Sequence, residues 1–408
     1  WVQAHRGFES HPVRHRRLMF QALLAVTMPP VAPQSMGLSR PYRLAQAALV
    51  VVALYCAVTI DVQGVVRSVI LEGRYVGDFT VFWTAPRIEP SQVYDLEAIS
   101  QAQGPLLGGP KGARPFVNPP SLLPWLEPFG AMPFFVAFAA WVCLGLAAFA
   151  AACRKVVSWR HAPLIILAPP FVLGVVAGQV SLLVAAAVVA ALANLKARPI
   201  LAGALLGVAA TLKPQALVLA PIALAAGGHW RALAAALVAG LAVGSACVLV
   251  QGVDLWMDWW RALEQFAEIG QRYYLMKRGA TPSNLAYQLG LTGAAAAVLI
   301  NGLRVFGIFV VIAVFRWSED LPDRIAGLVA GSLLVVPYAM PPEAIPLLVP
   351  ASLWLLGADK RLWTPGFLLV SQLLLPVAVI AMAVAAFLRA VSGRELSSNL
   401  RWDDGGGT

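Results

Sequence analysis

The chain has 408 residues, of which 59% are hydrophobic and only 12% are charged, well below the charged share of an average soluble domain. With a mean hydropathy of +0.74, it carries too little polar surface to cover a soluble globule. The composition therefore excludes a soluble enzyme, a disordered chain, a coiled coil and a disulfide scaffold. The long Ala, Leu and Val runs do not alternate, which argues against an outer-membrane barrel. We expect an all-α polytopic integral membrane protein.

Most of the net charge of +10 belongs to the N-terminal tail and to the turns between apolar runs. No basic stripe with interleaved aromatics lies on a soluble module, so nucleic acid is not an expected partner. The five histidines lie in the tail or at turns expected in the cytoplasm, which disfavours zinc clusters and a Ser-His-Asp triad. The four cysteines lie in or beside apolar runs without metal-ligand spacing. We therefore expect no metal and no cofactor.

Residues 1–43 form a basic tail with six Arg and one Glu, and Met36 is a plausible true start within it. The first expected span is 44–60, whose Arg40 and Arg43 flank places the N-terminus in the cytoplasm. A long polar and aromatic segment, about 61–130, follows as the first outer loop. Its aromatic residues favour an ordered loop at the membrane interface.

The next two segments are too short for two full crossings each. There are 35 residues between Arg160 and Lys196, and 32 between Arg198 and Arg231. Two crossings need roughly 40 residues plus a turn. Each segment therefore predicts a pair of short helices, with turns near Gly178-Gln179 and Lys213-Pro214-Gln215. Such turns at membrane depth need protein or water around them, which indicates an outward-facing cavity.

The remaining chain predicts further spans and a second outer loop, followed by a disordered tail from residue 389 to 408. With the membrane domain at 44–388, we expect about eleven transmembrane helices, or twelve if Pro376 breaks the last span into a hairpin. The expected elements are spans at 132–152, 231–251, 294–315, 325–340, 345–357 and 364–388, with the second outer loop at about 252–290 and an outer turn at Pro341-Pro342-Glu343.

Three ionisable residues in or beside apolar runs are candidates for function, because charge at the bilayer centre costs at least ~2.5–3.5 kcal/mol. Lys213 is either a snorkelling or internally paired lysine or a cation for an anionic head group such as phosphate. For Arg304, snorkelling and a ligand role are both open. Glu343 follows Pro-Pro at the outer turn, where a solvated carboxylate is favoured. Asp78 precedes aromatics in the outer loop, and alone it is more typical of a helix N-cap than of a catalytic group.

A series of short motifs resembles bacterial glycosyltransferase family 87, which comprises polyprenyl-phosphate-mannose-type transferases of the C-type (GT-C) superfamily. The likeness covers roughly residues 45–345 and rests on the order and spacing of the motifs. They are Gly77-Asp78-Phe79, Phe82-Trp83, Val93-Tyr94-Asp95, Phe116-Val117-Asn118-Pro119-Pro120, Pro128-Phe129-Gly130-Ala131-Met132-Pro133, Gly178-Gln179-Val180-Ser181-Leu182, Ala202-Gly203-Ala204-Leu205-Leu206-Gly207 and Lys213-Pro214-Gln215.

The resemblance implies a GT-C-like fold with a large first extracytoplasmic loop and a lipid-accessible cavity. It also implies transfer of a hexose, with mannose expected, from a polyprenyl-phosphate donor to a lipid or glycan acceptor. This transfer would occur at the outer face of the bacterial cytoplasmic (inner) membrane, by inverting single displacement. Asp78 maps onto the family's acidic residue as the catalytic base, and Lys213 is the expected cation for the lipid phosphate. The other expected substrate-binding residues are Arg87, Tyr94, Arg114, Asn118, Gln179, Gln215 and Glu343. The family's Ser-Pro…Tyr-Asp or His-bearing turn is replaced here by Val336-Pro337-Tyr338-Ala339-Met340-Pro341-Pro342-Glu343.

Two other functions fit parts of the pattern. A transporter or lipid flippase would also use broken helices at the membrane midplane, but the sequence has no inverted repeat. A polysaccharide polymerase or ligase of similar topology would favour basic outer loops around a lipid diphosphate. The acidic, aromatic first outer loop is more typical of a polyprenyl-phosphate-sugar-dependent transferase.

Overall fold

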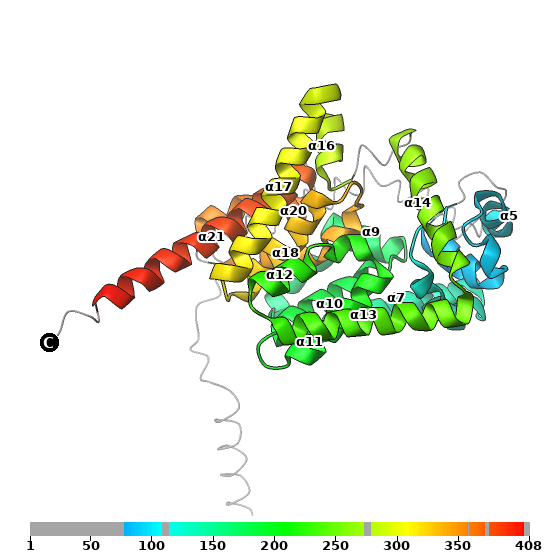
Figure 1. Ribbon diagram of the computed structural model, residues 1–408, viewed down its shortest axis with the longest axis horizontal. Coiled ribbons are helices and arrows are strands. Elements are labelled where there is room, and N and C mark those ends of the chain that lie inside the picture. The colour runs from blue at the N-terminus through cyan, green and yellow to red at the C-terminus, as the bar shows by residue number, and fades with distance from the viewer. Residues whose placement is uncertain (1–76, 108–113, 273–278, 358, 372–374, 404–408) are drawn as a thin grey trace, which may run out of the picture. The chain divides into compact units, whose positions relative to one another are not determined.

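The computed structural model describes residues 77–107, 114–272, 279–357, 359–371 and 375–403 (Figure 1). Within these ranges the secondary structure is helical, and no strand is found. The expected all-α polytopic membrane fold is confirmed. The tail 1–43 and the first expected span 44–60 lie outside the described residues.

Four described helices are long and apolar enough to cross a membrane: α7 (Phe134–Cys153), α13 (Trp230–Gln251), α17 (Gly293–Trp317) and the part of α21 from Leu375 to Gly393. A fifth results if the bent pair Trp159–Ile166 and Pro169–Val176, which meets at 69°, counts as one span. Eleven or twelve spans were expected. The described residues contain fewer full-length spans because several predicted crossings are short helices joined by turns. These shorter apolar helices are Ser181–Asn194 (α10), Pro199–Leu212 (α11), Pro214–Ala226 and Pro341–Leu356.

The two predicted helix breaks are confirmed. In the first segment, α9 (Pro169–Val176) ends just before Gly178-Gln179, and α10 begins at Ser181. In the second segment, α11 ends at Leu212, and the 3₁₀ helix η6 (Pro214–Leu217) precedes α12 (Ala220–Ala226). The residues around Gln179 and Lys213 are therefore irregular backbone between apolar helices.

Helices α11 and α13 pack with their backbones in close contact. A Cβ atom added at Gly203 or Gly207 would collide with the carbonyl oxygens of Ala232 and Ala236 on α13. Small residues four apart let two apolar helices approach this closely in a membrane. This contact fixes the C-terminal end of α11, where Lys213 follows.

The first outer loop is ordered over its described residues and packs on α7. Phe79 is fully buried, and its ring lies against Phe134, Phe138 and Trp141 of α7. Aromatic clusters of this kind bury a large apolar area. The helices of this loop are α4 (Phe79–Thr84), η2 (Ala85–Arg87), η3 (Pro90–Gln92), α5 (Leu96–Leu107), η4 (Pro120–Leu122) and α6 (Leu123–Gly130).

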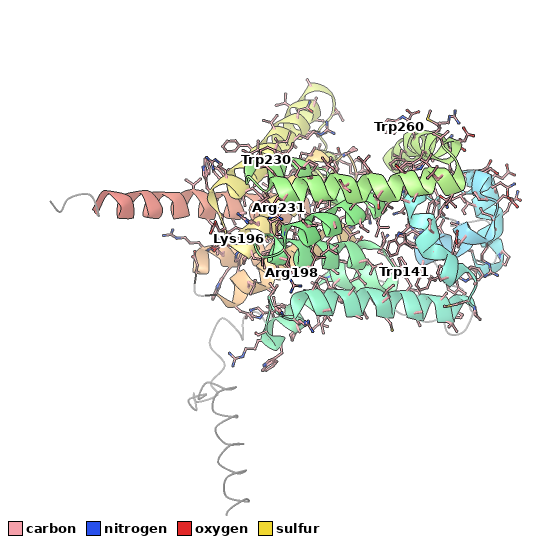
Figure 2. All side chains as sticks on the ribbon, turned by 60° about the horizontal axis from the view of Figure 1, so that its bottom comes forward. Trp141, Lys196, Arg198, Trp230, Arg231 and Trp260 are labelled. Atoms are coloured by element: carbon pink, nitrogen blue, oxygen red, sulfur yellow. The ribbon has the colours of Figure 1, made fainter. Side chains whose placement is uncertain are left out.

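The second outer loop contains α14 (Asp254–Arg272) and α16 (Pro282–Gln288). In both Figure 1 and Figure 2, α14 runs across the end of α13 rather than continuing it. Trp259 on α14 donates a hydrogen bond from Nε1 to the Val117 carbonyl at 3.1 Å. The two outer loops therefore contact each other.

Basic residues gather at the opposite end of the same helices. Figure 2 shows Lys196, Arg198, Trp230 and Arg231 at one end of α10, α11 and α13, and Trp260 of α14 near the far end of α13. Lys196 also forms an ion pair with Glu319, which follows α17. An excess of basic residues at one end, with tryptophans at both ends, is typical of membrane-spanning helices.

The C-terminal third contains α18 (Leu321–Val335), η7 (Pro341–Leu347), α19 (Leu348–Leu356), η8 (Lys360–Leu362), α20 (Trp363–Ser371) and α21 (Leu375–Asp403). The expected outer turn at Pro341-Pro342-Glu343 is instead the start of η7, and every residue of η7 is buried. Its proline and aliphatic side chains pack against α9, where Ile345 fills the space beside Gly174. Helix α20 ends at Ser371 and α21 begins at Leu375, and residues 372–374 lie outside the described residues. In place of the disordered tail expected from Arg389, α21 continues to Asp403, and Arg389 is anchored by Asp320 and Asp323.

Candidate active site

Asp78 lies at the N-terminal end of α4 but does not cap that helix. The carboxylate makes no capping hydrogen bond. Its Oδ2 atom instead accepts a hydrogen bond from Nε2 of Gln179, and its Oδ1 lies 3.6 Å from Nη1 of Arg114. About a quarter of the side chain is exposed. Asp78 therefore occupies the N-cap position without capping through its side chain, and the carboxylate is available for a tertiary role.

Gln179 is placed by a tight helix ending. Gly178 has a φ of +62°, and its N–H donates to the Val175 carbonyl while the Gln179 N–H donates to the Gly174 carbonyl. This pair of bonds is the Schellman motif, in which glycine adopts the left-handed conformation. The Phe79 N–H then donates to the Ala177 carbonyl at 2.9 Å. The turn therefore holds α4, and with it Asp78, beside Gln179.

Lys213 follows α11 and is buried, with 5% of its surface exposed. Its Nζ lies 3.2 Å from Gln179 Oε1, 2.8 Å from Ser181 Oγ and 2.8 Å from Glu343 Oε1. A lysine ammonium has three N–H donors, so these three acceptors use all of them. The internally paired interpretation of Lys213 is the one that the structure supports.

Glu343 is buried rather than solvated, which corrects the expectation for this residue. Only 3% of its surface is exposed, because η7 packs against α9 and α10 instead of turning outward. Oε1 forms the ion pair with Lys213, whereas Oε2 is buried without a hydrogen-bond partner among the described residues. A buried charge of this kind depends on its one partner.

The amide of Gln179 has its orientation set by its two neighbours. Lys213 offers only donors, and the Asp78 carboxylate offers acceptors. The amide oxygen must therefore face Lys213 and the amide nitrogen must face Asp78. The result is a continuous polar chain that joins Asp78, Gln179, Lys213 and Glu343, which we call the Asp78 network. It connects four segments that lie far apart in the sequence.

Arg114 is the cation nearest to Asp78. Its side chain is 42% exposed, so it is open to a ligand. The fully buried Gln103 fixes the Arg114 backbone at both polar groups, since Oε1 accepts from the Arg114 N–H and Nε2 donates to the Arg114 carbonyl. A surface side chain on a rigid backbone can present its charge in one place.

Arg87 was expected, like Arg114, to bind substrate, but its guanidinium is bound within the protein. Its Nη1 donates to the Gly130 carbonyl at 2.5 Å, and its guanidinium lies 3.9 Å from the centre of the Trp83 ring. Trp83 in turn donates to the Met132 carbonyl. Arg87 therefore ties η2 to the end of α6 within the first outer loop, and no described contact links it to the Asp78 network.

The remaining expected residues lie around Lys213. Tyr94 donates through its hydroxyl to the Asn118 carbonyl at 2.7 Å, and the Asn118 amide donates to the Leu212 carbonyl at 3.3 Å. These bonds dock the first outer loop on the last residue of α11. Gln215 is half-buried in η6, and no described contact joins it to Asp78.

Sequence reasoning missed three residues of the site: Gln103, Ser181 and Tyr338. Ser181 belongs to a quoted motif, but its bond to Lys213 depends on two turns meeting. Tyr338 lies near Glu343, Asp78 and Arg114, and its ring packs edge-on against Phe266 of α14.

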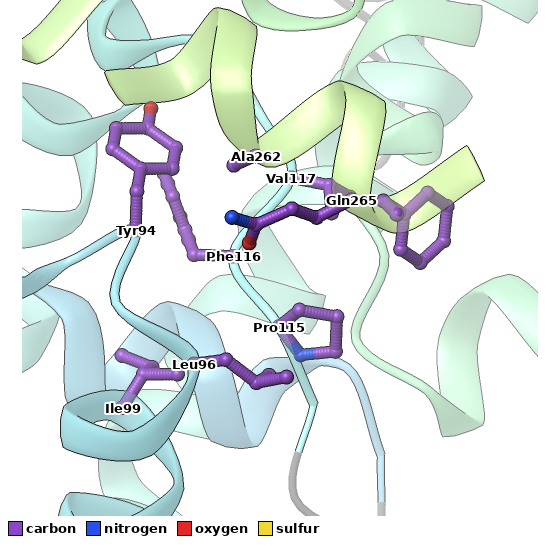
Figure 3. Close-up of a pocket in the computed structure, with 9 residues that line it drawn as sticks. Tyr94, Leu96, Ile99, Pro115, Phe116, Val117, Ala262 and Gln265 are labelled. Atoms are coloured by element: carbon purple, nitrogen blue, oxygen red, sulfur yellow. The ribbon is translucent and has the colours of Figure 1, made fainter. Parts of the chain in front are cut away.

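A small crevice lies between the first outer loop and α14 (Figure 3). Its wall includes Pro115, the residue after Arg114, and the Gln265 amide points into it. Tyr94, Phe116 and Phe266 supply aromatic rings. The crevice therefore lies between the two outer loops, and Pro115 in its wall is the neighbour of Arg114 in the chain.

These features define a multi-pass, all-helical membrane protein with a buried polar network ending in an accessible carboxylate. The family model for glycosyltransferase family 87 matches residues 116–341, which is more than half of the chain. The chain belongs to this family, and it is a membrane glycosyltransferase. The matched region includes Asn118, Gln179, Lys213 and Gln215, whereas Asp78 and Glu343 lie outside it. Searches of curated proteins and of solved structures found no match.

Proposed function

We propose that this glycosyltransferase moves a hexose, with mannose the expected sugar, from a polyprenyl-phosphate donor to a lipid or glycan acceptor. The observation that carries the proposal is the position of Asp78. Its carboxylate is partly exposed, held from behind by Gln179 and faced by the exposed Arg114. A displacement at a sugar phosphate requires a base for the acceptor hydroxyl and a cation for the leaving phosphate.

The proposed step is a single displacement. The acceptor hydroxyl gives its proton to the Asp78 carboxylate while its oxygen attacks the anomeric carbon. The bond between that carbon and the phosphate oxygen breaks, and the polyprenyl phosphate leaves with the electron pair. One base acting opposite the leaving group predicts inversion at the anomeric carbon.

The leaving phosphate needs a cation, and we assign this role to Arg114. An arginine guanidinium can bind phosphate through two parallel hydrogen bonds. Lys213 was the cation expected from the sequence, but its three N–H groups are used by Gln179, Ser181 and Glu343. We therefore assign Lys213 a positioning role, in which it orients the Gln179 amide and through it the Asp78 carboxylate.

The proposed orientation places the site outside the bacterial cytoplasmic membrane. Lys196, Arg198 and Arg231 mark one end of the helices, and cytoplasmic ends carry the excess of Lys and Arg. Asp78 belongs to the first outer loop, which contacts α14 at the opposite end of α13. A donor with its lipid in the outer leaflet would reach Asp78 there.

The test is transfer of labelled sugar in membranes that contain the full-length protein. Asp78→Asn should abolish transfer from polyprenyl-phosphate mannose while the protein is made normally, with a loss of about 10²-fold or more. Asp95→Asn is the matched control, because Asp95 only accepts the N–H groups of Glu97 and Ala98, which Asn also does. Full transfer by Asp78→Asn would remove Asp78 as the base. Transfer from a lipid diphosphate sugar alone would favour the polymerase or ligase reading.

A further inference from the structure

Arg304 lies near the middle of an apolar membrane helix. It is the twelfth residue of α17, which runs for 25 residues from Gly293 to Trp317 and is a candidate span. A charged side chain inside a span is costly and is a functional-site hypothesis by default. Among the described residues, α17 contributes nothing to the Asp78 network, so Arg304 needs an explanation of its own.

The guanidinium of Arg304 has few partners. Nη1 donates to Oδ1 of Asn301 at 3.3 Å, while Nε is buried and has no acceptor among the described residues. No carboxylate among the described residues forms an ion pair with Arg304. By contrast, Arg324 donates from Nε to the Ser318 carbonyl, and Arg389 pairs with Asp323. Buried donors are almost always satisfied, so an unmatched one indicates a missing partner.

Arg304 lies at the border between the packed and the open faces of α17. The packed face includes Gly307, which contacts Gly331 of α18. The open face includes Val298 and Val305, which are 74% and 68% exposed and suit lipid tails. At 100° per residue, Arg304 falls between these two faces, and its half-buried state agrees with that. Its guanidinium can therefore be reached sideways from the lipid.

The Cα of Arg304 lies at the depth of the lipid tails, so contact with a head group depends on the reach of the side chain toward the polar layer. At 1.5 Å per residue, its Cα lies about 16 Å from the Gly293 end of the helix. Side chains on a helix lean toward its N-terminus, and Asn301 lies one turn in that direction. A long arginine side chain can extend by several ångströms to reach the polar layer. The pair Arg304 and Asn301 therefore lies where a lipid phosphate could descend to meet it.

We propose that Arg304 and Asn301 form a binding site for the phosphate group of a membrane lipid. The guanidinium would turn outward so that Nε and one Nη group pair with two phosphate oxygens, which would satisfy Nε. The Asn301 oxygen already accepts from Arg304, so its amide nitrogen would donate to a third. A phospholipid and a polyprenyl phosphate share this chemistry, and either could occupy the site.

Native mass spectrometry of the full-length protein in detergent tests the site. The protein is titrated separately with phosphatidylglycerol, with polyprenyl phosphate and with diacylglycerol, which has no phosphate. We expect wild type to retain one phosphate lipid that Arg304→Gln loses, with at least a tenfold weaker affinity in the variant. The lipid that shows the difference identifies the source, and diacylglycerol should show none.

Two further variants make the result specific. Arg316→Gln removes an exposed cation from the same helix and should bind as wild type does. Arg304→Lys keeps the charge but loses the paired donors, and should bind with intermediate affinity. The thermal midpoint of Arg304→Gln should not fall, because the change removes an unpaired charge from an apolar helix. Equal retention of both phosphate lipids by wild type and Arg304→Gln, or an equal loss in Arg316→Gln, would overturn the proposal.

Discussion

Lys213 and Glu343 form a buried ion pair with Nζ and Oε1 2.8 Å apart, and this contact joins the end of α11 to η7. Neither residue reaches solvent, so each depends on the other for its charge. Lys213→Met would leave the Glu343 carboxylate buried and unpaired. Breaking such a pair from one side costs about 3–5 kcal/mol. We expect a clearly lower thermal midpoint for the purified variant in detergent.

The double variant Lys213→Met with Glu343→Leu separates the effect of the buried charges on stability from the effect of side-chain packing. It removes both charges together, so it should recover much of the stability lost by the single variant. Its transfer activity should nevertheless remain low, because Gln179 no longer has a donor to orient it. A double variant as unstable as Lys213→Met would show that the pair acts through packing alone.

Gln179 links Lys213 to the proposed base, Asp78. Gln179→Met keeps the approximate size of the side chain but removes the donor to Asp78. We expect kcat to fall by about tenfold, the equivalent of one hydrogen bond worth about 1.4 kcal/mol, with the donor KM unchanged. Gln101→Met, on the exposed face of α5, is the control and should leave both constants unchanged. If the KM for the sugar donor rose while kcat stayed constant, Gln179 would instead contact the sugar donor directly.

Arg114→Gln should impair catalysis, whereas Arg87→Gln should lower stability. Arg114→Gln should lower kcat/KM for the donor by about 10- to 100-fold, because a charge-assisted hydrogen bond contributes about 1.5–3 kcal/mol. Arg87→Gln should lower the thermal midpoint, since it loses the Gly130 bond and the Trp83 ring contact, while the kinetics of the folded fraction stay normal. The opposite pattern would exchange the two roles.

Local features of the site were predictable from the sequence. The helix breaks at Gly178-Gln179 and Lys213-Pro214-Gln215 follow from segment length and from the punctuation of glycine and proline. The scarcity of charge also identified Lys213 as a residue that needs a partner. These inferences need only a short stretch of chain each.

The partners were not predictable, because they depend on how distant segments dock. Glu343 looks like a solvated residue after Pro-Pro, and only the packing of η7 on α9 buries it. Asp78 has the sequence context of an N-cap, and only the Schellman turn at Gly178 brings a competing donor to it. Arg87 and Arg114 are equivalent loop arginines in sequence, and they differ only in which groups lie within reach.

Gly178 should tolerate no side chain. Its φ of +62° strains any other residue by about 1–2 kcal/mol, and an added Cβ would lie 2.6 Å from Cβ of Phe79. Gly178→Ala should therefore lower the thermal midpoint and also reduce transfer, because α4 must shift and carry Asp78 away from Gln179. Gly104→Ala is the matched control. Gly104 lies within α5 with no atom within 4 Å of an added Cβ, so alanine there should raise stability by about 0.5–1 kcal/mol. If Gly178→Ala behaved as Gly104→Ala does, the turn at Gly178 would not be what positions Asp78.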